Sequence, residues 1–299
     1  TGSYGPGAPT YLDGYERDSK VNTGSAQLRA DWYGDGWTAS SQIGYTGSTG
    51  GSAGIWNAQF KNLGGFNYNL DGQHPQINFN NGDNPSQSLL NGAGYSHAPT
   101  YDRERYFQAD FAHDVSWGPF NQIETGIKAT NHIDGQDAYA SNFPNDVLAA
   151  SGLPLSSIAG GGTPSGFLDG PSPAGNMRDW TTISKGGLKD LVNSLKDQYG
   201  YSVDPKATYS IAEQNRAFYL QGDFGGDNYR GNLGVRYFRT RDTVDGFSNI
   251  GNGQYAAINK RSSYHDWLPS LNVAYDVMDD LTLRFGAAKT IARPRYQQM

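Results

Sequence analysis

The stretch YFQADFAHDVSWGPFNQIETGIKAT, residues 106–130, decides the fold of this chain. Apolar Phe107, Ala109 and Phe111 alternate in it with polar Gln108 and Asp110. A Trp-Gly-Pro turn interrupts the alternation, which then resumes with the same period of two. Because successive side chains of a strand point to opposite faces of a sheet, the stretch predicts a hairpin with one apolar and one polar face.

The same arrangement occurs four times along the chain. The pairs of alternating segments are 24–32 with 37–46, 105–115 with 120–131, 215–224 with 229–241, and 265–276 with 281–291. Each pair has a very short turn, whereas the pairs are separated by long segments at about 47–104, 132–214 and 242–264. Strands of roughly 10 residues with short turns on one side and long loops on the other are typical of outer-membrane barrels. Soluble antiparallel sheets also alternate, but their strands are commonly about 5 to 6 residues long.

We therefore predict an all-β chain that forms part of a large antiparallel transmembrane barrel, with short periplasmic turns and long extracellular loops. One face of the strands would meet lipid. The polar face would line the lumen with Gln108, Asp110, Glu124, Lys128, Arg236 and Arg284. Aromatic residues flank the short turns, where a membrane-interface girdle is expected; they are Trp32, Trp37, Trp117, Phe120, Tyr229 and Tyr275.

Composition excludes several classes of protein. With 36% hydrophobic residues and a mean hydropathy of -0.66, the chain is not a bundle of membrane helices, and no apolar run approaches the roughly 20 residues of a spanning helix. The chain has no cysteine, which excludes disulfides and thiolate metal sites. A net charge of -6 argues against a nucleic-acid partner.

Motifs near the end of the sequence identify a family. They are WLPSLN at 267–272, YD at 275–276, DDL at 279–281, LRF at 283–285 and ARP at 292–294. This series resembles the barrel of TonB-dependent outer-membrane receptors, especially the proteobacterial branch linked with uptake of carbohydrates and other complex nutrients. The resemblance is strong over 264–299, and upstream it is architectural.

The resemblance implies a barrel of about 22 strands in the bacterial outer membrane, with a plug domain of the same protein in its lumen. It also implies energy from the TonB–ExbB–ExbD complex through a TonB box, and no cofactor. Neither plug nor TonB box is visible in the sequence, so we expect residues 1–299 to be an internal segment of the barrel domain. The implied function is active import of a bulky nutrient, with a carbohydrate as the first expectation.

Other functions remain open at this point. A siderophore or haem receptor of the same superfamily, a passive porin and a secreted polysaccharide-binding β-protein all fit parts of the pattern. Enzymes fit poorly, because the five histidines lack metal-ligand spacing such as HExxH and no GxSxG or P-loop motif occurs. We therefore expect no catalytic site.

Ligand specificity is expected in the long loops, as in other scaffold-mounted sites. Sugars bind where aromatic faces cover their C–H surface and polar groups grip their hydroxyls. Candidates of these types are Tyr95, Tyr101, Asp102, Arg103, Tyr139 and Trp180. An Asn/Asp cluster at 78–84 offers oxygen ligands for calcium but lacks EF-hand spacing, so turn formation is the simpler interpretation.

The segment 132–214 contains a predicted helix. Leu188, Leu191, Val192 and Leu195 recur at helical spacing, and Gly200 follows where a helix would stop. The apolar stripe would pack on the loop or barrel mouth, or alternatively contact a surface lipoprotein. The preceding stretch 152–175 is rich in Gly, Pro and Ser and predicts irregular loop.

Three charged or polar residues break the apolar parity: His113, Arg239 and Lys289. The last two lie near the long-loop ends of their strands. There they would extend outward and meet the phosphates of lipopolysaccharide, or simply sit at the rim.

Overall fold

The computed structural model describes residues 1–71, 76–80, 87–167, 174–175 and 180–292. The chain divides into two compact units. Unit 1 comprises residues 1–20, 51–99 and 138–204, and unit 2 comprises 21–50, 100–137 and 205–299. Among the described residues, no helix is long and apolar enough to cross a membrane.

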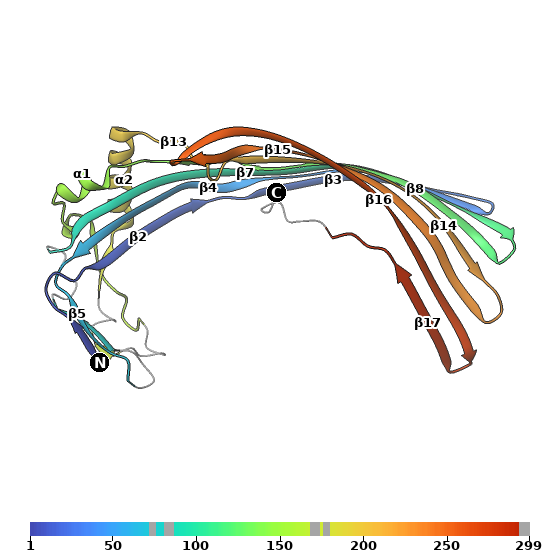
Figure 1. Cartoon of the computed structure of the whole chain (residues 1–299), viewed down its shortest axis with the longest axis horizontal. Helices are drawn as coiled ribbons and strands as arrows, with labels where there is room; N and C mark the ends of the chain where they lie inside the picture. The colour runs from blue at the N-terminus through green and yellow to red at the C-terminus, as the bar shows by residue number, and fades with distance from the viewer. Residues whose placement is uncertain (72–75, 81–86, 168–173, 176–179, 293–299) are drawn as a thin grey trace. The chain divides into compact units, whose positions relative to one another are not determined.

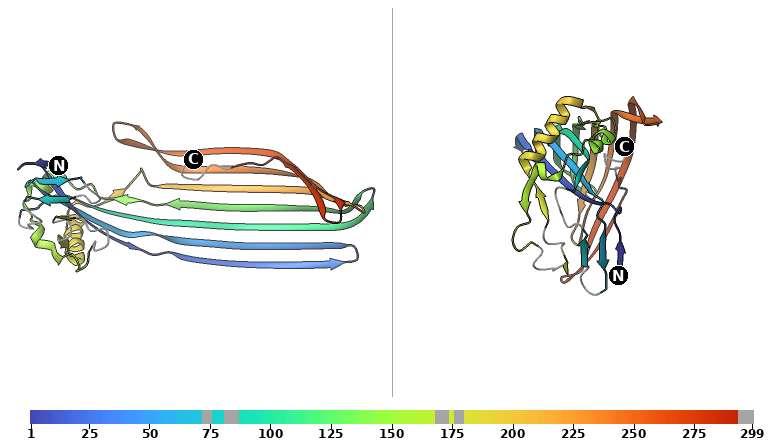
Figure 2. Two further views of the ribbon diagram at one scale, coloured as in Figure 1. Left: turned by 90° about the horizontal axis from the view of Figure 1, so that it is seen from below. Right: turned by 90° about the vertical axis from the view of Figure 1, so that its left-hand side faces the viewer.

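Unit 2 is one antiparallel sheet of consecutive hairpins. Its strands, some of which continue into unit 1, are β3 (Asn22–Gly34), β4 (Trp37–Asn62), β7 (Leu89–Trp117), β8 (Phe120–Gln136), β14 (Tyr209–Gly225), β15 (Tyr229–Gly251), β16 (Gln254–Met278) and β17 (Leu281–Ala288). Each strand pairs with its neighbours in that order. The turns β3–β4, β7–β8, β14–β15 and β16–β17 all lie at the same end of the sheet (Figure 1), and Figure 2 (left) shows the strands side by side. The four predicted hairpins and the all-β antiparallel fold class are confirmed.

The strands extend well beyond their predicted ends. The segment 242–264, expected to be a loop, continues as strand: β15 runs to Gly251, β16 starts at Gln254, and the register joins Asp242 to Ser262 and Asn249 to Tyr255. Glycines 251 and 253 and Asn252 have positive φ angles and make the tight turn. In this segment both faces of the strands are largely polar, so apolar and polar residues no longer alternate. The backbone hydrogen bonding between β15 and β16 nevertheless continues.

The other two predicted loops also contain regular structure. Strand β4 continues to Asn62 and pairs there with β2 (Thr10–Ser19), a strand that alternation did not predict. Strand β7 begins at Leu89, β8 ends at Gln136 and β14 begins at Tyr209. The short strands of unit 1 are β1 (Gly2–Tyr4), β5 (Phe66–Asn69), β6 (Gln76–Phe79), β9 (Tyr139–Ala140), β10 (Ala159–Gly162), β11 (Ala174–Gly175), β12 (Thr181–Ile183) and β13 (Ser202–Val203).

The predicted helix is confirmed as α2 (Lys185–Tyr199). The Ser184 side chain caps its start by accepting a hydrogen bond from the Gly187 amide, and Gly200, with φ of 74°, follows its end. The stretch 152–175 is not wholly irregular, because it contains a 3-10 helix, η1 (Leu155–Ile158), and strand β10. A further helix, α1 (Asn145–Ala150), was not predicted.

Unit 1 holds the buried hydrophobic core of the described chain. Its members come from β4, β7, the two helices, η1 and the segment before α1: Ala58, Phe60, Leu90, Phe143, Leu148, Leu155, Ile158, Leu188 and Val192. Leu188 and Val192 are 2% and 0% exposed. Leu188 and Val192 of the apolar stripe of α2 therefore pack inside unit 1, and Leu191 and Leu195 lie partly buried against the same core. Contact of the stripe with a surface lipoprotein stays a prediction.

Candidate functional site

One face of the unit 2 sheet is apolar and uncovered within the described chain. We call it the apolar face; cross-strand register places on it Leu28, Ile43, Phe107, Phe111, Ile127, Phe218, Leu220, Leu233, Val235, Trp267, Leu283 and Phe285. Leu28 is 71% exposed and Leu283 is 58% exposed. Water-soluble monomers rarely expose contiguous apolar patches beyond a few hundred Å². Hydrocarbon is the environment that such a face requires.

An aromatic belt follows the short-turn end of the sheet. The Trp117 ring lies 6.2 Å from that of Phe120, Phe120 lies 6.0 Å from Phe224, and Phe224 lies 6.5 Å from Tyr229. These contacts cross β7, β8, β14 and β15. Three of the six predicted aromatic residues, Trp117, Phe120 and Tyr229, thus join Phe224 at the end of the sheet where amphipathic rings would meet lipid headgroups.

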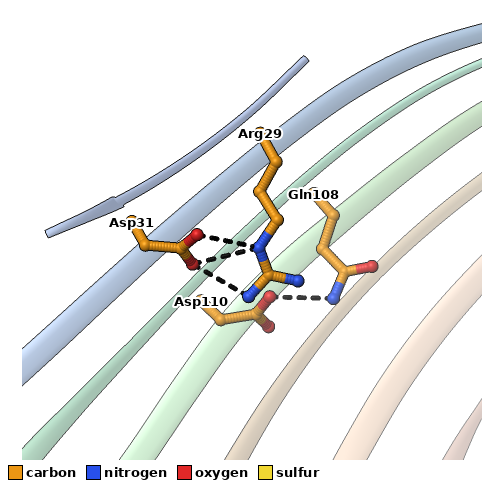
Figure 3. Close-up of polar contacts among 4 residues, drawn as sticks. All are labelled: Arg29, Asp31, Gln108 and Asp110. Atoms are coloured by element: carbon orange, nitrogen blue, oxygen red, sulfur yellow. Dashed lines mark hydrogen bonds and ion pairs between the residues drawn. The ribbon is translucent and has the colours of Figure 1, made fainter. Parts of the chain in front are cut away.

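The opposite, polar face of unit 2 carries a hydrogen-bonded network (Figure 3). Arg29 donates from Nε to both carboxylate oxygens of Asp31 at 3.0 Å, and Gln108 donates to Asp110 at 2.8 Å. The Tyr219 hydroxyl donates to the same Asp110 at 3.0 Å. Gly126 makes this possible, since a Cβ there would lie 2.4 Å from Asp110 Oδ1 and 2.5 Å from the Tyr219 ring.

The register places the predicted lumen residues on this polar face. Gln108 lies opposite Lys128, Tyr219 lies opposite Arg236, and Gln221 lies opposite Glu124. Arg284 lies opposite Ala274, on the same face of β16 and β17. That this face lines an occupied lumen stays a prediction.

A row of aromatic rings runs through unit 1. The row comprises Trp56, Tyr95, Tyr201, Tyr139 and His97, and each ring contacts the next, with centroids 5.8, 5.5, 6.1 and 5.8 Å apart in that order. Strand pairing assembles it: β9 pairs with β7, which sets Tyr139 opposite His97, and β13 pairs with β9. Tyr201 is 51% exposed, so the row reaches the surface of the described unit.

Cations from α2 flank the aromatic row. The Lys196 ammonium lies 4.9 Å from the centroid of the Tyr95 ring, and that of Lys189 lies 4.2 Å from the Trp56 ring. Lys189 also forms an ion pair with Asp18 at 2.6 Å. The Asn193 amide oxygen accepts hydrogen bonds from the Trp56 indole at 3.0 Å and from Lys196 at 3.3 Å. The helix therefore presents donors and a positive charge along the rings.

Burial and ion pairing shift the pKa values of two groups in unit 1, Tyr95 and Asp18. Burial, followed by the nearby Tyr201, raises the pKa of the Tyr95 hydroxyl above its ordinary value, so the hydroxyl remains a neutral donor at physiological pH. The hydrogen bond from Lys189 lowers the pKa of the Asp18 carboxyl. The lowered pKa of Asp18 favours the charged carboxylate that pairs with Lys189 of α2.

The six predicted ligand residues are only partly brought together. Tyr95 and Tyr139 belong to the aromatic row, and Tyr201 connects them. Tyr101, Asp102 and Arg103 lie in unit 2 instead, where Arg103 stacks 5.8 Å from the Tyr101 ring and Asp102 pairs with His132 at 3.1 Å. Trp180 lies before β12 and is not part of the row; its carbonyl accepts a hydrogen bond from the Thr163 amide at 3.0 Å.

Trp56, Tyr201 and Lys196 were missed as candidates. Trp56 lies in β4, Lys196 in α2 and Tyr201 just after α2. These three residues are brought together only by the packing of strands and helix in the folded unit. Of the Asn/Asp cluster, Asn78 and Asn80 donate to Asn67 and to backbone carbonyls, and residues 81–84 lie outside the described residues. Among described side chains, no group of three or more His, Asp or Glu residues is placed to hold a metal ion.

The three parity-breaking residues have different environments. Lys289 forms an ion pair with Asp266 at 2.7 Å, and its side chain is 53% exposed, so its contact with lipopolysaccharide stays a prediction. The His113 ring stacks 6.4 Å from Phe111 on the apolar face. Arg239 is exposed on that face.

Comparison with known proteins gives a family for the whole chain. Residues 1–299 match the family described as TonB dependent receptor-like, beta-barrel. Among solved structures, the chain is similar to the ferric citrate transporter FecA in the unliganded form, with 11% identity and a TM-score of 0.40 over 89% of this chain and 35% of that chain. The closed form of the ferric-catecholate import receptor Fiu from E. coli K12 shares 9% identity at a TM-score of 0.40, over 85% and 33% of the two chains.

The copper transporter OprC shares 12% identity at a TM-score of 0.32, over 96% of this chain and 47% of that chain. The chain thus spans about a third of the length of FecA and Fiu and nearly half of that of OprC. No curated protein sequence matches it.

Proposed function

Because the chain belongs to the TonB-dependent receptor β-barrel family and lies in the bacterial outer membrane, we propose that it forms part of a receptor that imports a bulky nutrient across that membrane. The observation that carries the proposal is the two-faced sheet of unit 2, with an apolar face suited to lipid and a hydrogen-bonded polar face suited to a lumen. Neither a passive porin nor a secreted polysaccharide-binding protein fits the family.

In the full protein, the polar face would contact a plug domain or passing solute. Side chains such as Gln108, Lys128 and Arg236 supply both donors and charge for such contacts. Energy would come from the TonB–ExbB–ExbD complex of the inner membrane, acting through the plug. No chemical step on the ligand is needed, so we infer transport without catalysis.

We propose a carbohydrate as the first candidate for the ligand. The aromatic row supports it, because flat rings cover the C–H faces of sugars while Asn193 and the Tyr95 hydroxyl lie beside the rings to bond hydroxyl groups. The five rings extend over four successive contacts of 5.5 to 6.1 Å, which suits a ligand of several sugar units rather than a single small solute.

A siderophore or haem is the second candidate, and a specific observation favours it. Lys196 and Lys189 place ammonium groups beside the aromatic row, and an anionic or aryl chelate combines the negative charge and flat surfaces that such a site binds. Lys189 is already paired with Asp18, which leaves Lys196 as the cation on which this alternative depends.

Growth of a strain lacking the full-length receptor gene, complemented with variants, tests both proposals. Trp56→Ala with Tyr95→Ala should abolish growth on the transported carbon source, whereas Tyr11→Ala, which removes a 51% exposed tyrosine of the same unit, should not. If this double variant loses about 2 kcal/mol of binding free energy, the receptor binds the transported nutrient roughly 30-fold more weakly. Normal growth on every single carbon source, combined with a defect under iron limitation, would reject the carbohydrate and support the chelate.

A further inference from the structure

Three arginines cluster on the apolar face of unit 2. Arg216 of β14 and Arg239 and Arg241 of β15 are all exposed, and we call them the arginine cluster. Arg216 lies directly opposite Arg239 in the strand register, and Arg239 lies opposite His265 of β16. Like charges directly opposite each other destabilise a strand pair, so this arrangement favours an anion that separates them.

The arginine cluster lacks carboxylate partners. In the part of the chain that the structure describes, no Asp or Glu forms an ion pair with any of the three, whereas Arg29 and Arg230 on the polar face pair with Asp31 and Asp276. The three guanidinium groups and Gln214 line a small pocket of about 40 Å³. A pocket lined by guanidinium and amide donors fits a phosphate group.

The position of the cluster along the strands matches a membrane boundary. Tyr229 belongs to the aromatic belt, and about 10 residues separate it from Arg239 on the same strand, a length of roughly 33 Å along the strand. At a tilt of about 40°, this spans ~25 Å across the membrane, the height of the apolar band of such barrels. The arginines therefore lie at the boundary opposite the short turns.

An apolar groove adjoins the cluster. Its volume is about 850 Å³, and its lining includes Leu28, Ile43 and Phe107 together with Tyr45, Arg105 and Arg216. Along each strand, Tyr45 and Arg105 lie farther from the short turns than Ile43 and Phe107. The groove thus has an apolar part within the band and a cationic end, where the Arg105 guanidinium lies 6.0 Å from the Tyr45 ring.

We propose that this surface binds a phosphorylated, acylated glycolipid of the outer leaflet, the lipid A portion of lipopolysaccharide. The arginine cluster holds one phosphate, Arg105 reaches a second polar group, and an acyl chain occupies the groove. Because the short turns are expected on the periplasmic side, the cluster lies in the outer leaflet, where this lipid resides. The site is independent of which nutrient is imported.

Lipid binding to the full-length receptor purified in detergent tests the proposal. The probes are diphosphoryl lipid A, monophosphoryl lipid A and phosphatidylglycerol, titrated against wild type, Arg216→Gln with Arg239→Gln, and Arg236→Gln. Arg236 is a matched control because it lies on the same strand as Arg239 but on the polar face. Each arginine near the membrane surface contributes about 1 kcal/mol, so the double variant should bind diphosphoryl lipid A roughly 30-fold more weakly.

The control should bind as wild type does, and monophosphoryl lipid A and phosphatidylglycerol should bind more weakly than diphosphoryl lipid A. A second double variant, Arg216→Lys with Arg239→Lys, keeps both charges and should retain most of the binding, which separates charge loss from misfolding. Equal binding by the glutamine double variant and wild type would overturn the proposal. So would an equal loss in Arg236→Gln, or phosphatidylglycerol binding as tightly as diphosphoryl lipid A.

Discussion

Replacing Leu233 by arginine tests whether the apolar face meets lipid. Leu233 is 51% exposed and lies on β15 opposite Gly222 and Leu271. It is about four residues from Tyr229 of the aromatic belt, hence ~13 Å along the strand and ~10 Å across the membrane at a tilt of about 40°. This depth is close to the middle of an apolar band of roughly 25 Å, where an arginine costs about 2–4 kcal/mol.

Ser270→Arg is the matched control, because Ser270 lies on β16 opposite Gly234 and faces the polar side of the same sheet. The full-length receptor should be refolded into lipid vesicles, and the folded fraction measured by heat-modifiable gel mobility across a urea series. Leu233→Arg should lower the free energy of unfolding by about 2–4 kcal/mol, and Ser270→Arg should change it little. If both arginines were equally harmless, Leu233 would face water and the membrane assignment of this face would be refuted.

Three further predictions concern packing and charge. Gly126→Val should destabilise the sheet by about 1–3 kcal/mol, because even a Cβ there would overlap Asp110 and the Tyr219 ring; the same refolding assay measures it, and an unchanged urea midpoint would contradict the packing. Phe60→Ala, at a position 0% exposed, should cost about 3–5 kcal/mol within unit 1 and speed proteolysis in 138–204, whereas Tyr11→Ala should not. Because the pKa of Asp18 is lowered in the folded state, its ion pair with Lys189 stabilises α2 fully at pH values above the ordinary carboxyl pKa of 3.8. This stabilisation is lost as the pH falls through the lower pKa of the folded state. Amide hydrogen exchange of α2 should accelerate in that pH range, and Asp18→Asn should remove this pH dependence.

The hairpins of unit 2 were predictable because a membrane imposes a strict period of two on their side chains. The alternation around Phe107, Gln108 and Ala109 is sufficient to place a strand and to assign its faces. The same rule failed at 242–264, because both faces there carry mostly polar side chains. The alternation therefore gave no signal, although backbone hydrogen bonds continue the pairing of β15 with β16. Strand β2 was missed for the same reason.

The candidate site was less predictable. Aromatic character singled out Tyr95 and Tyr139, but Trp56, Tyr201 and Lys196 join them only through pairings distant in sequence, such as Ser202 with Ala140 in β13 and β9. The arginine cluster likewise depends on register. Arg239 was visible as a break in the pattern, whereas its direct opposition to Arg216 became visible only when β14 paired with β15.

By itself, the sequence determined the all-β class, the four hairpins, the two chemically distinct faces and helix α2, since these follow from local periodicity and turn chemistry. Only the tertiary structure decided which loop residues form the aromatic row and which cations lack carboxylates. The physical reason is that long-range strand pairing is selected by backbone hydrogen bonds and packing summed over many residues, and no single stretch of sequence encodes that sum.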